Sequence, residues 1–150
     1  MPVTSVLLNL LWIIFGGLWM ALAWVVAAIL MAITIIGLPW ARAAFNIAIA
    51  LYTLLPFGQK AVSRAEYTGR EDLGTGPLGV IGNIIWLLVA GWWLALLHLM
   101  TAVLLAVTII GLPFAWAHVK LAGLALWPIG KMIVPIDEVD RRGRLGRHVG

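Results

Sequence analysis

The sequence predicts an all-α integral membrane protein with two tandem repeats, each made of a long helix, a break and a short helix. Three observations support this prediction. The chain of 150 residues is 63% hydrophobic and only 11% charged. No Asp, Glu, Lys or Arg occurs in residues 1–41 or 73–119, and each stretch far exceeds the roughly 20 apolar residues that cross a bilayer. The third observation is an internal duplication, so we expect about four membrane segments.

The duplication is clearest in the hexapeptide Thr-Ile-Ile-Gly-Leu-Pro, which occupies residues 34–39 and recurs at residues 108–113. With an offset of 74, residues 9–41 match residues 83–115 at 16 of 33 positions. The matches include Asn, Trp, Gly and Pro, which coincide by chance less often than apolar residues do. The chain therefore contains two copies of one membrane unit, and membrane proteins of this kind often place their working site at the junction of the repeats.

Each apolar block is interrupted once, at Gly37 and Pro39 in the first repeat and at Gly111 and Pro113 in the second. Gly commonly ends a helix in a left-handed conformation, and Pro suits the first turn of the next helix. The predicted helices cover about residues 6–36, 39–55, 80–110 and 113–126. The predicted domains are a first membrane repeat (1–56), a polar loop (57–77), a second membrane repeat (78–134) and a charged tail (135–150).

The long helices would reach roughly 45 Å and must tilt or project from a hydrocarbon core of about 30 Å. The short helices would reach roughly 25 Å, which leaves two alternatives. If they cross fully, the loop and the tail lie on one side, and their basic residues place that side in the cytoplasm. If they re-enter, there are two crossings, and the loop and tail lie on opposite sides. We favour the first alternative.

Small residues recur on one face of both long helices, and this face is predicted to pack against another helix or a second copy of the chain. A pathway lined by these residues is the functional alternative. The matched tryptophans Trp12, Trp19, Trp86 and Trp93 are expected on the opposite face, towards lipid or a neighbouring subunit. The small residues are Gly17, Ala21, Ala28, Ala32, Gly91, Ala95, Ala102 and Ala106.

Polar residues at membrane depth are the candidate site residues, because such groups are costly in lipid. Asn9 and Asn83 occupy equivalent positions and are expected to hydrogen-bond across helices. Arg42, with Asn46 one turn later, follows the break at the start of a predicted short helix, where free N–H groups favour an anion. For Arg42, anion contact and simple extension of the side chain to the headgroups remain alternatives.

Two further candidates lie in the second repeat. Lys120 aligns with Asn46, and extension to the headgroups is again its alternative role. His98 replaces Trp24 of the first repeat, and it is either a proton-sensitive group on a pathway or a hydrogen-bonded packing residue. We therefore treat Arg42, Asn46, His98 and Lys120 as candidate pathway or anion-contacting residues.

Several functions are excluded by what the sequence lacks. With no cysteine and no His at ligand spacing, we expect no metal and no cofactor. No nucleophile–base pair is visible and the carboxylates are confined to the loop and tail, so we do not expect an enzyme. The net charge of +4 comes from basic residues that flank the membrane segments, which is typical of membrane orientation rather than nucleic-acid binding.

The pattern Asn-Ile-Ile-Trp (83–86), Gly-Trp-Trp-Leu (91–94), His98, Ile-Ile-Gly-Leu-Pro (109–113), Lys120 and Ala-Leu-Trp-Pro-Ile-Gly (125–130) resembles the bacterial YccF-type family of inner membrane proteins. The resemblance covers about residues 9–134, and it is more specific in the second repeat than in the first. It implies a bacterial inner-membrane location and duplicated domains, and it supplies no catalytic or binding residues.

The sequence therefore leads to two expectations about function. The first is a homo-oligomer in the lipid bilayer that forms a pore or conducts a small solute or ion, with Arg42 and Lys120 favouring anions. The second is a non-conducting accessory or scaffold subunit of another membrane protein. The loop 57–77 and the C-terminus are expected in the cytoplasm.

Overall fold

The computed structural model describes residues 3–33 and 55–148, with the side chains of residues 32 and 143–148 left out of the description. The first repeat contains α1 (Val3–Trp12), the π-helix η1 (Ile13–Gly17) and α2 (Leu18–Ile33). Next come β1 (Gln59–Ser63) and α5 (Arg64–Thr68). The second repeat contains α6 (Pro77–Trp86), the π-helix η3 (Leu87–Gly91), α7 (Trp92–Ala106), α8 (Leu112–Leu126), β2 (Lys131–Pro135) and α9 (Ile136–His148).

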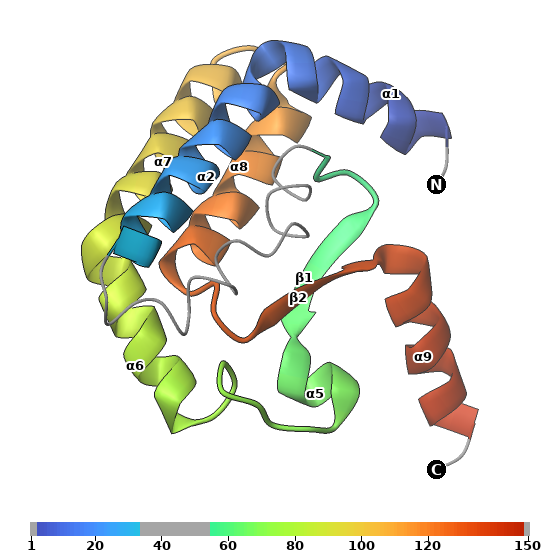
Figure 1. Ribbon diagram of the computed structural model, residues 1–150. Helices are drawn as coiled ribbons and strands as arrows, with labels where there is room; N and C mark the ends of the chain where they lie inside the picture. Colours follow the sequence, from blue (N-terminus) through green and yellow to red (C-terminus); the bar gives the residue numbers. More distant parts are fainter. Residues whose placement is uncertain (1–2, 34–54, 149–150) are drawn as a thin grey trace.

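The helices α2, α7 and α8 run side by side, and the two strands cross below one end of this bundle (Figure 1). The core lies between these helices and is made mainly of Trp, Ala, Leu and Met. The mostly helical architecture in two repeated halves is confirmed. The two-stranded ribbon and the helix α9 were not predicted. β1 lies in the predicted polar loop, β2 lies at the end of the predicted second membrane repeat, and α9 lies in the predicted tail.

Two helical stretches, Val3–Met31 and Pro77–Ala106, are long and apolar enough to cross a membrane. Only 28% and 39% of their most apolar windows is buried inside the protein, so most of this surface is available to lipid. The third apolar helix, Leu112–Leu126, is shorter, and its bounds agree closely with the predicted short helix of the second repeat.

Each long helix is interrupted after the same tryptophan, by a kink at Gly16 in the first repeat and by a π-turn in the second. The rings of Trp12 and Trp86 are buried, and each fills the space that a side chain would need at the glycine five residues later, Gly17 or Gly91. A π-helix contains one residue more per turn than expected from α-helical spacing. The prediction that these two tryptophans face lipid or a neighbouring subunit was therefore wrong. Both rings are buried inside the protein, because the interruption after each tryptophan changes the helical register. Trp19 is exposed, as predicted.

The small-residue face is packed in both long helices, as the prediction of a packing face requires. The buried members are Gly17, Ala21, Ala28, Gly91, Ala95 and Ala102. Ala106, the last residue of α7, is exposed instead, and the side chain of Ala32 lies outside the description.

The two long helices differ at one pair of equivalent positions. Gly16 has a φ of 134°, a conformation that is accessible to glycine and strained for other residues, and α1 turns away from α2 at this point (Figure 1). The equivalent residue in the second repeat is Ala90, and there α6, η3 and α7 form one continuous helix. The sequence predicted two similar long helices, whereas the first is bent and the second is continuous. In addition, α2 runs in the opposite direction to α7.

The break after α7 forms a tight hairpin that brings α8 back along α7. Pro113 lies in the first turn of α8, as predicted. Gly111 has a φ of −77°, so the predicted left-handed conformation is wrong. A side chain there would collide with the Leu105 carbonyl and the Thr108 hydroxyl, so close approach, and not handedness, requires glycine. Gly37 and Pro39 lie outside the described residues.

Each repeat closes through one asparagine and a Pro-X-Gly turn. Asn83 Nδ2 donates to the Ile129 carbonyl oxygen at 3.0 Å, and Ile129 N donates to Asn83 Oδ1 at 3.0 Å. Asn9 makes the same pair with Phe57, at 3.1 and 3.0 Å. The glycine of each turn has a positive φ, 86° and 90°. The expected role of these amides as structural bonds fits this geometry, although their partners are turn backbones and not side chains.

The strands β1 and β2 pair antiparallel, with Ala61 opposite Ile133. These two residues are equivalent when the repeats are aligned on their Pro-X-Gly turns. Trp24 and His98, also equivalent, are joined by a hydrogen bond. Contacts between equivalent positions are the mark of a local two-fold relation. The ribbon also brings residues of the central loop next to residues that precede the tail, as expected if the loop and the tail lie on the same side.

Outside the bundle, side-chain contacts hold the central loop in shape. Arg64 contacts Asp72 through Nε–Oδ2 and Nη2–Oδ1, both at 2.7 Å. The hydrogen bond from Arg64 keeps the pKa of the Asp72 carboxyl below its usual value. Tyr67 donates to Glu138 at 2.6 Å, and Arg142 stacks on the Tyr67 ring at 4.2 Å. These contacts join α5 to α9, so the tail begins as a packed helix.

We predict that Asn83→Ala and Asn83→Asp both destabilise the protein, by about 2–4 kcal/mol, because each leaves buried turn groups without a partner. Asp keeps an acceptor for Ile129 N but places an oxygen against the Ile129 carbonyl. Denaturant unfolding of the reconstituted protein measures the loss, with Gly123→Ala, an open helical position, as control. Wild-type stability in both variants would contradict the assigned role.

We predict that Gly16→Ala straightens the first helix, because alanine resists the positive φ found there. Since the chain has no cysteine, spin labels can be introduced at Val3 and Ile33 alone. Their separation should rise towards roughly 45 Å, the length of a straight helix. Gly123→Ala serves as control. An unchanged distance distribution would show that Gly16 does not set the bend.

Candidate functional site

The strongest concentration of polar groups inside the bundle is a pair of histidines. His98 on α7 and His118 on α8 are both fully buried. Their Nδ1 atoms lie 2.9 Å apart, which is a hydrogen-bond distance. No Asp, Glu, Lys or Arg occurs in α7, and Lys120 is the one such residue in α8, so the surroundings of the pair are mostly apolar. An ionisable group in such a place is a functional candidate.

The donors and acceptors around the pair fix its protonation. Trp24 Nε1 donates to His98 Nε2 at 3.1 Å, and an indole nitrogen is a donor only. His98 Nε2 therefore carries no proton, which leaves the proton of the neutral ring on Nδ1. That N–H donates to His118 Nδ1, so His118 carries its proton on Nε2. One proton therefore lies between the two histidine rings. Adding a proton to His98 Nε2 would break the hydrogen bond from Trp24, and adding one to His118 Nδ1 would break the bond between the histidines.

Aromatic rings enclose the histidines. The Trp12 and His118 rings are 4.4 Å apart, and Trp24 stacks on Trp86 at 5.6 Å with an interplanar angle of 22°. Trp86 Nε1 donates to the Ala125 carbonyl oxygen at 2.7 Å, which fixes this ring against α8. The histidine pair is thus enclosed by side chains from α1, α2 and α6.

Only one of the four candidate site residues belongs to this cluster. His98 does, but Arg42 and Asn46 lie outside the described residues. Lys120 is exposed on α8, and its Nζ lies 5.6 Å from the centre of the Trp116 ring. Lys120 and His118 are two residues apart and therefore point to different faces of the helix. The structure does not bring Lys120 to His98.

His118 was the functional candidate that sequence reasoning missed. The predicted hairpin could have identified it. Because α7 ends at Ala106 and α8 begins at Leu112, residues 98 and 118 lie at similar distances from the turn and therefore beside each other. The alignment of repeats drew attention to His98 and Trp24 separately, without predicting that they touch. Among the described residues, no group of three or more His, Asp or Glu is arranged to hold a metal ion.

We predict that Trp24→Phe destabilises the protein by about 1–3 kcal/mol, because it leaves His98 Nε2 buried without its donor. Nitrogen NMR of labelled histidine provides a second readout. Wild-type His98 should show the Nδ1–H tautomer, and the variant should lose that preference. Trp19→Phe, at a position 74% exposed, is the matched control. Equal stability and an unchanged tautomer in Trp24→Phe would rule out the assigned bond.

Comparison with known proteins agrees with the duplicated architecture. A family model described as the inner membrane component domain matches residues 7–59 and again residues 81–131. The chain is 35% identical over 133 residues to the inner membrane protein YccF of Escherichia coli strain K12, with 87% of each chain covered. The inner membrane protein YccF of Shigella flexneri gives the same values. No solved structure matches the chain.

The two matched ranges coincide with the two repeats and together cover well over half of the chain. The resemblance seen in the sequence is therefore confirmed, as is the location that it implies. The chain belongs to the YccF family of inner membrane proteins, and it carries the inner membrane component domain twice.

Proposed function

We propose that the chain is a homo-oligomeric module of the inner membrane that conducts a small ion or solute. The observation that supports this most is the buried, hydrogen-bonded pair of His98 on α7, which has no charged residue, and His118 on α8. Polar and ionisable groups in such positions commonly mark ion paths or proton relays. We propose no enzymatic activity, because the described carboxylates lie outside the helical bundle.

In this proposal the described conformation is closed. Trp24 occupies one side of the pair and Trp12 the other, and both indole rings are almost fully buried. Passage of a proton through the protomer requires Trp24 to move away from His98 Nε2. The freed nitrogen then accepts a proton, while the Nδ1–H of the same ring is passed to His118. Conduction would thus be coupled to the breaking of the hydrogen bond between Trp24 and His98.

A preference for anions is the second part of the proposal. Lys120 is an exposed cation on an otherwise uncharged helix, and basic rings select anions in pores. Because Lys120 and His118 point to different faces of α8, an anion path would pass between protomers and not through the histidine pair. Apolar side chains exposed on the same helix, such as Trp116, offer a surface for contact between copies.

The second candidate function is a non-conducting accessory or scaffold subunit. The filled interior favours it, because Trp24, Trp86 and Leu94 are almost completely buried in the core. A protein that only packs against a partner needs no pathway, and its buried histidines would then serve to fix the register of α7 and α8.

Ion flux in proteoliposomes tests the proposal, with proton, chloride and potassium gradients applied separately. We predict that His98→Phe reduces proton flux roughly tenfold while the oligomer stays intact, and that Lys120→Gln lowers the ratio of chloride to potassium flux. Trp19→Phe is the control. Absence of flux under voltage and all three gradients would overturn the conducting role. Co-purification of one stoichiometric membrane partner would then support the accessory role.

A further inference from the structure

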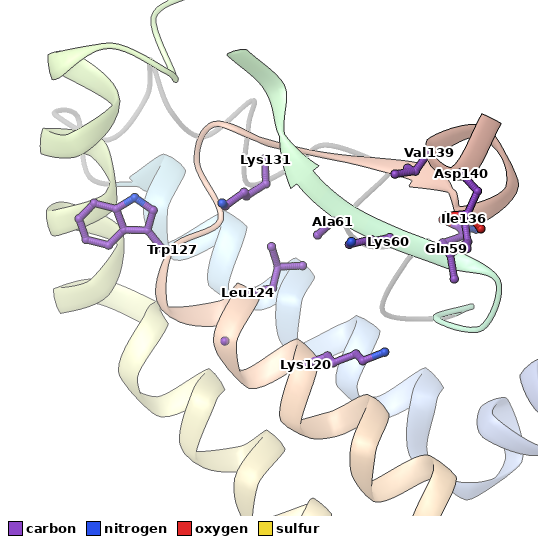
Figure 2. Close-up of a pocket in the computed structure, with 11 residues that line it drawn as sticks. Gln59, Lys60, Ala61, Lys120, Leu124, Trp127, Lys131, Ile136, Val139 and Asp140 are labelled. Atoms are coloured by element: carbon purple, nitrogen blue, oxygen red, sulfur yellow. The ribbon is translucent and has the colours of Figure 1, made fainter. Parts of the chain in front are cut away.

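A groove of about 800 Å³ lies between α8, the ribbon and the first turns of α9. Three of its lining residues are lysines from three different elements, namely Lys60 of β1, Lys120 of α8 and Lys131 of β2. Figure 2 shows Lys60 on the ribbon and Lys120 on the helix, on two sides of the groove. Residues 60 positions apart in the sequence thus form one basic surface.

Among the described residues, the cations that line this groove outnumber the carboxylates. Its lining contains three ammonium groups and one carboxylate, that of Asp140. In the part of the chain that the structure describes, the one ion pair is between Arg64 and Asp72, which lie elsewhere. The groove therefore offers a net positive site that an anion would neutralise.

The rest of the lining is apolar and amphipathic. Leu124 and Trp127, at the end of α8, form the wall beside the lysines. Trp127 is 40% exposed, and tryptophans at helix ends commonly lie at the level of the lipid headgroups. A volume of about 800 Å³ is typical of a site for an organic ligand, and it is far larger than a single small anion requires. The groove therefore combines basic groups for a phosphate with an apolar wall for the start of a hydrocarbon chain.

We propose that this groove binds the headgroup of an anionic phospholipid of the inner membrane. Lys60, Lys120 and Lys131 contact the phosphate oxygens, and the glycerol and the first carbons of the acyl chains lie along Leu124 and Trp127. Basic pockets beside membrane helices on the cytoplasmic side commonly hold such lipids. The site does not involve the histidine pair. It shares Lys120 with the proposed anion path, whereas Lys60 and Lys131 belong to the lipid site alone.

The test uses the full-length protein in detergent, stripped of lipid and then mixed with vesicles of phosphatidylglycerol or of phosphatidylcholine. Native mass spectrometry counts the lipids retained. We expect retention of phosphatidylglycerol to fall roughly fivefold for each lysine replaced by glutamine, and on the order of 100-fold for the triple variant. Arg70→Gln, which removes an exposed cation outside the groove, is the control and should retain lipid as the wild type does.

A second variant separates loss of binding from loss of folding. Asp140→Asn removes the one carboxylate among the described lining residues. It should therefore increase retention of phosphatidylglycerol, a gain that misfolding cannot imitate. Equal retention of both lipids, equal loss with Arg70→Gln, or no gain with Asp140→Asn would overturn the proposal. Inorganic phosphate is also tested as a competitor, at the same total negative charge as the anionic lipid. If it displaces phosphatidylglycerol as effectively as added phosphatidylglycerol does, the proposal is overturned and the groove is a site for free anions.

Discussion

The paired hydrogen bonds between an asparagine and a turn backbone are the constraint on which the rest of the structure depends. Backbone groups that leave a helix near the hydrocarbon region have no water to bind, so they need a partner inside the protein. Asn83 supplies both partners for Ile129 in one contact. This fixes the direction in which the chain leaves α8, and thereby the position of β2, the ribbon and the basic groove.

The helix α8 carries two different chemistries on two faces. His118 points into the bundle and shares one proton with His98, while Lys120 is exposed to the groove. The separation follows from a spacing of two residues, which is more than half a turn of helix. A proton-linked role for the interior and a lipid-linked role for the surface can therefore exist in the same short helix without affecting each other.

The contact at the junction of the repeats depends on their divergence. Trp24 and His98 occupy equivalent positions, yet an indole N–H can only donate and an imidazole nitrogen can accept. Two tryptophans at these positions would provide no acceptor. The divergence at Gly16 and Ala90 has a comparable consequence, because one helix bends and the other does not. The two repeats thus share a plan, and their differences create the features that are candidates for function.

The sequence by itself determined the membrane class, the duplication, the hairpin at Gly111–Pro113 and the membership of one helix face, because apolar runs, repeats and helix breakers act locally. It also identified His98 and Lys120 as unusual residues. Tertiary structure alone decided that His118 completes the histidine pair, that Trp12 and Trp86 are buried, and that residues 59–63 pair with residues 131–135. Each of these outcomes depends on a contact between distant segments or on an interruption that shifts the helical register, and neither leaves a periodic pattern in the chain.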